Sequence, residues 1–241
     1  MAHALPLPIA GSVPDDLRKT AAARLHPSLT DPNFLVLRSR RVIFAKWIGQ
    51  VSGNALHVLD IGGRYQPYRP LFGDRAARYV GCDILPTQCV NVVGDGEALP
   101  FAEHTFDVVI ATQVFEYFAE PRSAARQIHR VLKSGGCLLM SVAATTPRCV
   151  DEELWRFTPQ GVRAILADFT QVKILPETSS IGGIVRILNM AVRSFARARV
   201  LQALVAGMVC PVLNAAGMAC EALRVTDNDQ FSPNYSAMAV K

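Results

Sequence analysis

The chain has 241 residues, half of them apolar and 19% charged, which suits one α/β domain with a large buried core, either alone or with an appended segment. This balance excludes a disordered chain and a small domain that depends on disulfides or metals. The net charge of +5 is not gathered into a run of Lys and Arg interleaved with aromatic residues, which make up only 7% of the chain, so no nucleic-acid-binding surface is predicted.

The cysteines and the N-terminal segment bear on location. No C-x-x-C pair occurs and no cysteine has a histidine at metal-ligand spacing, so we predict neither a metal site nor a disulfide framework. Reduced, mostly buried thiols are typical of a cytosolic protein. The start, MAHALPLPIAG, lacks the basic region of a signal peptide, which also favours the cytoplasm. The cysteines are Cys82, Cys89, Cys137, Cys149, Cys210 and Cys220.

The N-terminal region divides into an arm and a helix. Residues 1–33 are rich in Pro, Ala and Ser, and we expect a loosely packed arm with one short helix over 15–25. From 34 to 51 apolar residues recur at helical spacing until Gly53 ends the pattern. This second segment is predicted to cover one edge of a sheet.

Short β-rich runs alternate with helical ones from residue 56 onward. The expected strands are LHVLDI, RYVGCDI, NVVG, FDVVIAT, CLLMSVA, QVKILP and YSAMAVK, and helices are expected over 122–132 and 158–167. The pattern predicts an α/β fold: a Rossmann-like, seven-stranded, mostly parallel sheet with helices on both faces, in one domain over 34–241. Ligands of such sheets lie at the carboxyl ends of the strands.

An acidic residue and two glycines follow the first strand. In LHVLDIGGRYQPY, Asp60 ends the strand, and Gly62 and Gly63 allow the backbone to approach a ligand closely. The start of a following helix would offer N–H groups to anionic or polar atoms. The three-glycine dinucleotide pattern is absent, because Arg64 and Gln66 stand where later glycines would be. A plain tight turn is the alternative interpretation.

Asp83 ends the second strand. It follows Gly62 by roughly 20 residues, which is the spacing of a carboxylate that accepts hydrogen bonds from ribose hydroxyls. The alternative is an aspartate that caps the turn formed with Ile84 and Leu85, and this alternative leaves the spacing unexplained.

Five short motifs occur in a fixed order: LDIGG, GCDI, GDGEALPF, FDVVIATQVFEY and RVLKSGG. Together they resemble the type 11 branch of class I S-adenosylmethionine-dependent methyltransferases, over about residues 57–169. WRFTPQG and the ending NYSAMAVK are similar to a subgroup associated with surface-glycan and glycosyl-transfer genes. The resemblance implies S-adenosylmethionine as the cofactor and methyl transfer as the reaction, with no metal required.

The resemblance also implies where the cofactor lies. Asp60, Gly62 and Gly63 would line its methionine end, and Asp83 would hold the ribose. The remaining implied cofactor-binding residues are Ile84, Asp95 and Gly96 toward the adenine edge, and Gln113 and Val114 beside the bound cofactor. Asp95 also has an alternative interpretation, as a turn-forming residue in Gly-Asp-Gly.

Two positions depart from the family pattern. Arg64 replaces the second motif glycine and brings positive charge toward a sulfonium cofactor, and Tyr117 stands where many relatives have histidine, the obvious general base. An oxygen acceptor has to lose a proton as the new bond forms. The catalytic candidates are Tyr117, Glu116, Asp151 and Glu152, with Trp155 and Arg156 to shape or grip the acceptor. Each catalytic candidate has a structural alternative: Glu116 and Tyr117 would cap a turn, and Asp151 and Glu152 would form the charged first turn of a helix.

Residues 181–224 are predicted to be an apolar helical insertion before the last strand, and no charge occurs from Val200 to Cys220. The first part has the pattern of a basic amphipathic helix suited to anionic lipid, whereas Gly207 and Pro211 argue against a transmembrane span. A helical hairpin that covers the substrate cleft or forms a homodimer contact is the alternative. The predicted apolar face is Ile184, Leu188, Ala191 and Phe195, and the predicted basic face is Arg186, Arg193 and Arg197.

The leading hypothesis is methyl transfer to a small or lipid-linked acceptor, an oxygen nucleophile on a glycan-type intermediate. A non-catalytic binding or scaffold protein that keeps the fold is the alternative, motivated by Arg64 and Tyr117. A nicotinamide-dependent oxidoreductase ranks last, because it needs the Gly-rich pyrophosphate turn that is missing here. We expect a cytoplasmic protein, with a peripheral position at the inner face of the membrane as a further hypothesis.

Overall fold

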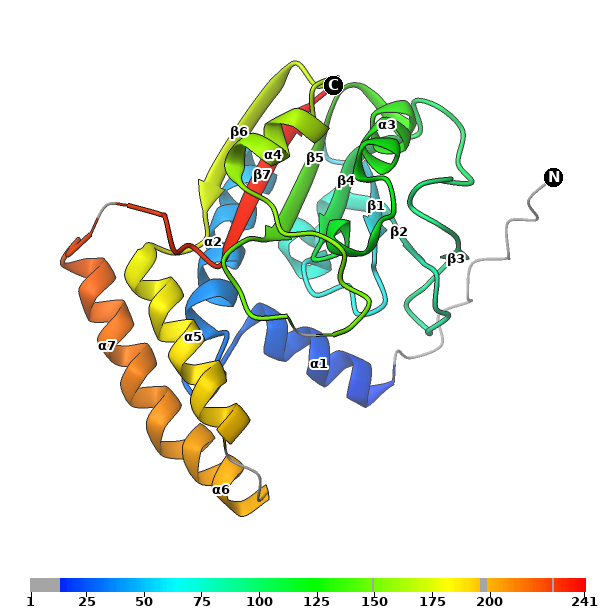
Figure 1. Cartoon of the computed structure of the whole chain (residues 1–241). Helices are drawn as coiled ribbons and strands as arrows, with labels where there is room; N and C mark the ends of the chain where they lie inside the picture. Colours follow the sequence, from blue (N-terminus) through cyan, green and yellow to red (C-terminus); the bar gives the residue numbers. More distant parts are fainter. Residues whose placement is uncertain (1–13, 149, 196–198, 227) are drawn as a thin grey trace.

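A computed structural model of the chain describes residues 14–148, 150–195, 199–226 and 228–241. Within these residues, seven strands form one sheet in the order β3-β2-β1-β4-β5-β7-β6 (Figure 1). β7 pairs antiparallel with β5 and β6, and the other pairs are parallel. The predicted fold class is confirmed. The strands are β1 Leu56–Ile61, β2 Ala76–Asp83, β3 Val92–Val93, β4 Phe106–Thr112, β5 Leu132–Ala143, β6 Gln171–Pro176 and β7 Asn234–Val240.

β1, β4 and β5 form the centre of the sheet. Val58, Ile110 and Leu139, one from each strand, are completely buried. Strands covered on both faces need apolar side chains at nearly every position, which explains the continuous apolar runs in the sequence. β5 begins earlier than predicted, because Leu132 already pairs with Phe106 of β4 across a register shift.

Helices cover both faces of the sheet (Figure 1). α2 (Phe34–Gln50) lies on one face, and α3 (Pro121–Val131) and α4 (Pro159–Ile165) lie on the other. The prediction that α2 covers an edge of the sheet is wrong. Its side chains Phe44 and Trp47 are fully buried in the same apolar cluster as side chains of β1, β4 and β5, so α2 closes a face.

The N-terminal helix α1 (Asp15–Leu25) has the predicted bounds. Leu25 is buried in the cluster beneath α2, and the Arg24 guanidinium lies 4.8 Å from the centre of the Tyr65 ring. This helix therefore packs on the domain. Residues 1–13 of the predicted arm lie outside the described residues.

The connection from β1 to β4 differs from the prediction. Residues 62–105 are all described, and they contain no α-helix, only the 3₁₀ helix η1 (Arg69–Arg75) between β1 and β2. The predicted helix start after the two glycines is therefore wrong. Gly73 explains why a longer helix does not form, because its φ of +53° interrupts helical geometry.

A helical hairpin follows β6 and projects from the sheet (Figure 1). One arm is α5 (Ser180–Phe195), and it packs against a longer arm built from α6 (Arg199–Leu204), the π-helical turn η3 (Val205–Val209) and α7 (Cys210–Ala222). The hairpin occupies the place predicted for the helical insertion, before the last strand.

The prediction that the arginines of α5 suit an anionic lipid surface is wrong for Arg186. Arg186 is buried and donates to Asn33 Oδ1 at 2.8 Å and to the Thr146 hydroxyl. Ile184 and Leu188, by contrast, are each 45% exposed. Arg186 is therefore directed toward the domain, whereas Arg193, near the end of the helix, is exposed together with apolar side chains. Two members of the predicted pattern, the Phe195 side chain and Arg197, lie outside the described part of the chain.

A buried ion pair joins α2 to the sheet. Arg40 Nε and Nη2 donate to the two carboxylate oxygens of Glu177 at 2.8 and 2.9 Å, and the two side chains are 5% and 0% exposed. The hydroxyls of Ser141 and Ser236 donate to the same carboxylate at 2.5 and 2.8 Å. A fully buried charge is tolerated only with such complete pairing.

Arg40→Met should lower the free energy of unfolding by about 3–5 kcal/mol, because it leaves the Glu177 carboxylate buried without its cation. Urea denaturation measures the loss. Combining Arg40→Met with Glu177→Met should restore part of it, since the double variant contains no unpaired buried charge. A loss below about 1 kcal/mol for Arg40→Met alone, as for a surface pair, would contradict this account.

Candidate active site

The turn after β1 is built from Gly62 and Gly63. Gly62 has a φ of +76°, and a Cβ on Gly63 would lie 2.5 Å from the Asp60 carbonyl oxygen, so both positions require glycine. Their N–H groups donate to the Cys82 carbonyl oxygen at 2.8 and 3.4 Å. These amides therefore hold β1 against β2, and a ligand at this turn would contact the backbone without using these two N–H groups.

Asp60 is a buried carboxylate at the carboxyl end of β1. It is 2% exposed, and its Oδ2 accepts a hydrogen bond from the Tyr79 hydroxyl at 2.7 Å. Burial raises the pKa of Asp60 to about 7, the nearby Asp83 charge adds to this rise, and the Tyr79 hydrogen bond opposes it. A cation bound beside Asp60 would favour its ionised form.

Asp83 already has a cationic partner. Arg64 Nε and Nη2 donate to the two Asp83 carboxylate oxygens, each at 3.2 Å, and the Leu85 N–H donates to Oδ1 at 2.9 Å. The Asp83 side chain is 4% exposed and that of Arg64 is 36% exposed. Both oxygens that would receive ribose hydroxyls are engaged, so a ribose has to share Asp83 with Arg64 or displace it.

The residues predicted for the adenine edge have mixed environments. Ile84 is 65% exposed. Asp95 is exposed, and its Oδ1 accepts from the Glu97 N–H at 2.9 Å, so its side chain forms the turn. Gly96 is buried, and a Cβ there would lie 2.6 Å from the Phe118 ring. Gly96 is thus needed for packing against Phe118.

The end of β4 lies against the β1 turn. A Cβ on Gly62 would be 3.3 Å from Val114 Cβ, which brings the two predicted segments into contact. Gln113 adopts a φ of +51°, uncommon for a residue other than glycine, and is held by hydrogen bonds from its N–H to Ser141 O (2.8 Å) and from Nε2 to Ser141 Oγ (3.1 Å). Strained backbone held in this way is frequent at ligand sites.

Sequence analysis missed the network behind Gln113. Ser141 connects Gln113 to Glu177, and Glu177 connects to Arg40. A signal was present in α2, because Arg40 continues the buried stripe formed by Val36 and Phe44 at spacings of four residues. A charge in such a stripe predicts a buried partner, although it does not identify the partner.

Of the two neighbouring candidates for the general base, Glu116 is buried and Tyr117 is exposed. Glu116 is 2% exposed, its Oε1 accepts from the Ala143 N–H, and its carbonyl oxygen accepts from the Leu154 N–H at 2.7 Å. Burial raises the pKa of Glu116 to about 7, and Oε2 has no hydrogen-bond partner among the described residues. Tyr117 is 42% exposed. Glu116 thus fastens the loop after β5 to the end of β4.

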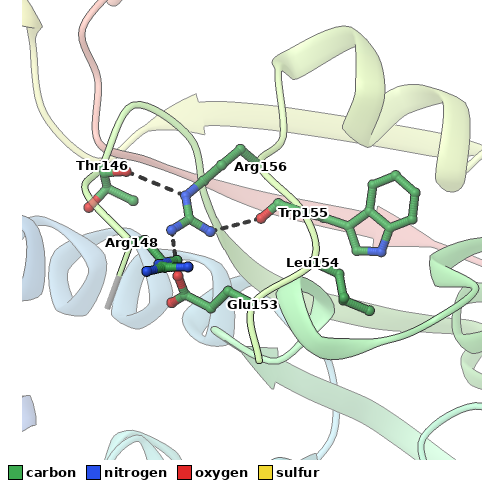
Figure 2. A pocket seen from close by; sticks show the side chains of 6 residues that line it. All are labelled: Thr146, Arg148, Glu153, Leu154, Trp155 and Arg156. Atoms are coloured by element: carbon green, nitrogen blue, oxygen red, sulfur yellow. Dashed lines mark hydrogen bonds and ion pairs between the residues drawn. The ribbon is translucent and has the colours of Figure 1, made fainter. Parts of the chain in front are cut away.

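The loop after β5 forms an open pocket of about 260 Å³ (Figure 2). Arg156 donates to Glu153 Oε2 at 2.5 Å and to the Trp155 carbonyl oxygen at 2.9 Å, and Trp155 Nε1 donates to the Phe118 carbonyl oxygen at 2.7 Å. Trp155 and Arg156 therefore line this pocket, whereas Asp151 and Glu152 are exposed outside it, and the predicted role of these residues toward an acceptor stays a prediction. The lining residues are Thr146, Arg148, Glu153, Leu154, Trp155 and Arg156.

The thiols of two buried cysteines are unreactive, although the Cys82 backbone belongs to the site. Burial raises the pKa of the Cys82 and Cys137 thiols to about 12, so both stay protonated at neutral pH. In the part of the chain that the structure describes, no disulfide and no group of three potential metal ligands occurs. Cys149 lies outside that part.

Comparison with known proteins identifies the domain. A family model described as "Methyltransferase domain" matches residues 59–140. The chain is 33% identical, over 95 residues, to malonyl-[acyl-carrier protein] O-methyltransferase 1 of Coxiella burnetii, a match that covers 36% of this chain and 34% of that protein. Matches to further curated methyltransferases likewise cover about a third of their length.

Solved structures support the fold. The putative methyltransferase crystallised with the Haloferax volcanii Trm112 methyltransferase activator has a TM-score of 0.54 at 16% identity, with 95% of this chain and 99% of that chain covered. A SAM-dependent methyltransferase from Archaeoglobus fulgidus has a TM-score of 0.52 at 18% identity, with 84% and 94% covered. The chain thus carries a class I methyltransferase domain, and this domain implies S-adenosylmethionine as the cofactor.

Arg64→Gly should strengthen S-adenosylmethionine binding roughly tenfold, because it frees both Asp83 oxygens for ribose hydroxyls. Isothermal titration calorimetry measures the change, with Arg64→Lys as the control that keeps the charge and loses the two-pronged contact. Weaker binding by Arg64→Gly would show that Arg64 holds the cofactor instead of competing with it.

S-Adenosylmethionine should bind ~10-fold more tightly at pH 8 than at pH 6. The Asp60 carboxyl, with its pKa near 7, loses its proton over this interval, and its negative charge then stabilises the positive sulfonium. S-Adenosylhomocysteine has no sulfonium and should lack this dependence, as should S-adenosylmethionine with the Asp60→Asn variant. Equal pH dependence for both ligands would rule out a role for Asp60 at the sulfonium.

Proposed function

We propose that this chain is an S-adenosylmethionine-dependent methyltransferase that acts on an oxygen nucleophile of a small or lipid-linked acceptor, such as a glycan-type intermediate. The proposal is supported by one arrangement above all. Asp60 and Gly62 at the end of β1, Asp83 at the end of β2 and Val114 after β4 meet at one edge of the sheet. Parallel sheets of this kind bind ligands at that edge.

The residues fit the cofactor in chemistry. The glycine turn offers an approach free of Cβ atoms, Asp60 offers a carboxylate to a cation, and Asp83 offers two acceptor oxygens once Arg64 shifts. When bound, the cofactor supplies a methyl group that is already activated by attachment to cationic sulfur. The chain itself then has to align the acceptor and exclude water.

The acceptor is proposed to bind in the pocket after β5. Trp155 offers an aromatic surface there. Arg148 and Arg156 are paired with Asp151 and Glu153, so an acceptor that carries negative charge, such as a phosphate-linked lipid, would share these arginines with the two carboxylates. Glu116 lies beneath this loop, and its pKa of about 7 suits a group that receives a proton at neutral pH. Access to Glu116 requires the Leu154 and Trp155 segment to move, because their N–H groups are bonded to the Glu116 carbonyl oxygen.

Arg64 supports a second candidate function, a non-catalytic binding or scaffold protein. Its ion pair occupies both oxygens of the Asp83 carboxylate, the group that would otherwise bind the ribose. In this alternative the fold persists while cofactor binding is lost.

The first test is calorimetric titration of the purified chain with S-adenosylmethionine and S-adenosylhomocysteine. Micromolar binding is expected, and Asp83→Ala should abolish it, because a buried carboxylate that receives two ribose hydroxyls is lost. Asp168→Ala, which removes an exposed aspartate elsewhere, is the matched control and should bind normally.

Absence of binding at millimolar cofactor by a well-folded sample would favour the scaffold function. With binding established, transfer of a labelled methyl group to extracted lipid-linked glycans, compared with water-soluble glycans, identifies the acceptor class. The same assay decides between Glu116→Gln and Tyr117→Phe as the variant that loses the general base.

A further inference from the structure

The hairpin formed by α5, α6, η3 and α7 buries two asparagines beside a small apolar cluster around Val205 and Cys210, and it exposes several large apolar side chains. Asn189 and Asn214 are 0% and 1% exposed, and Asn189 Nδ2 donates to Asn214 Oδ1 at 3.0 Å. Asn214 Nδ2 in turn donates to the carbonyl oxygens of Leu29 and Asp31. A water-soluble helix pair normally has the opposite arrangement, with asparagine outside and leucine inside.

Glycines allow the hairpin helices to approach closely. A Cβ on Gly217 would lie 2.7 Å from Leu35 Cδ1 and 3.3 Å from Val185 Cγ2, and a Cβ on Gly182 would lie 2.7 Å from Glu221 Oε1. Contacts through small residues, reinforced by hydrogen bonds between polar side chains, are typical of helix pairs in lipid.

The outer face of the long arm is apolar. Leu204, Met208 and Val212 recur every four residues on one side and are 52%, 67% and 68% exposed. Among the described residues, the 23-residue helix Val200–Ala222 is long and apolar enough to cross a membrane, and only 22% of its apolar window is buried. An apolar surface of this size is unfavourable in water and marks a site of association.

Charge decides between a bilayer and other partners. The chain has a net charge of +5, and the run of 21 residues from Val200 to Cys220 carries no charge. Arg193, near the end of α5, is exposed. An exposed arginine next to an apolar face complements anionic headgroups, whereas a purely apolar partner would leave its charge unpaired. The cleft-cover alternative is weaker, because no hairpin residue lines the pocket.

We infer that the hairpin lies in the interface of an anionic bilayer, with the face of Leu204, Met208 and Val212 in the acyl boundary and Arg193 at the headgroup phosphates. A flat position is favoured over a span, because Arg186 and Asn214, within the two arms, are bonded to Asn33 and Leu29 outside the hairpin. Arg186 bonds to Thr146, which lines the pocket, so the pocket is held close to the membrane surface. This last consequence, delivery of a lipid-linked acceptor, rests on the proposed function, whereas membrane binding does not.

Vesicle flotation of the full chain tests the inference. The probes are vesicles of phosphatidylcholine alone and with about 30 mol % phosphatidylglycerol. Met208→Glu places a charge on the apolar face, and Val42→Glu, at a side chain 56% exposed on α2, is the matched control. The wild type and Val42→Glu should float with the anionic vesicles, and Met208→Glu should bind at least about tenfold more weakly.

The remaining outcomes are separable. Failure of the wild type to float with anionic vesicles overturns the inference, as does equal flotation of Met208→Glu. If light scattering without lipid shows a dimer that Met208→Glu dissociates, and no flotation occurs, the face is a subunit interface and the inference is wrong. Calorimetric cofactor binding is measured without lipid, so failure of membrane binding and failure of the proposed function are distinguishable.

Discussion

The buried ion pair between Arg40 and Glu177 connects the fold to the candidate site. Arg40 comes from α2 and Glu177 directly follows β6, while the serines that share the carboxylate come from β5 and β7. Removing two charges from water costs several kcal/mol per ion, so the pair is stable only while these elements keep their positions. Ser141 extends this constraint to Gln113, whose strained backbone faces the turn after β1.

Two carboxylates at the carboxyl edge of the sheet, those of Asp60 and Asp83, differ in whether a cationic side chain is paired with them. Asp60 is buried without a cation, and its pKa rises accordingly. Asp83 is equally buried but is paired with Arg64. The arginine that departs from the family pattern thus neutralises one of two neighbouring acids. Whether it competes with a ligand depends on the free energy of that ion pair relative to hydrogen bonds from the ribose.

The sheet domain buries its large apolar side chains, whereas the hairpin exposes several of its own. In the sheet domain, apolar side chains such as Val58 and Ile110 are inside and completely buried. In the hairpin, Asn189 and Asn214 occupy the inside and Met208 and Val212 the outside. One chain can hold both arrangements because one side of the hairpin packs on the domain, through α2 and through the bonds of Arg186 and Asn214 to loops, while the side of Met208 and Val212 is exposed. A lipid environment would make the second arrangement favourable.

The sequence by itself determined the sheet, the turn at Gly62 and the place of Asp83, because strand periodicity and motif spacing are local properties of the chain. Only the tertiary structure decided that Arg40 meets Glu177, 137 residues away, and that Arg64 occupies Asp83. It also decided which side of α5 is inside. Periodicity separates the arginines of that helix from its apolar side, but whether an arginine is buried depends on what packs against it. Asn33 and Thr146 offer acceptors to Arg186, whereas Arg193 is exposed.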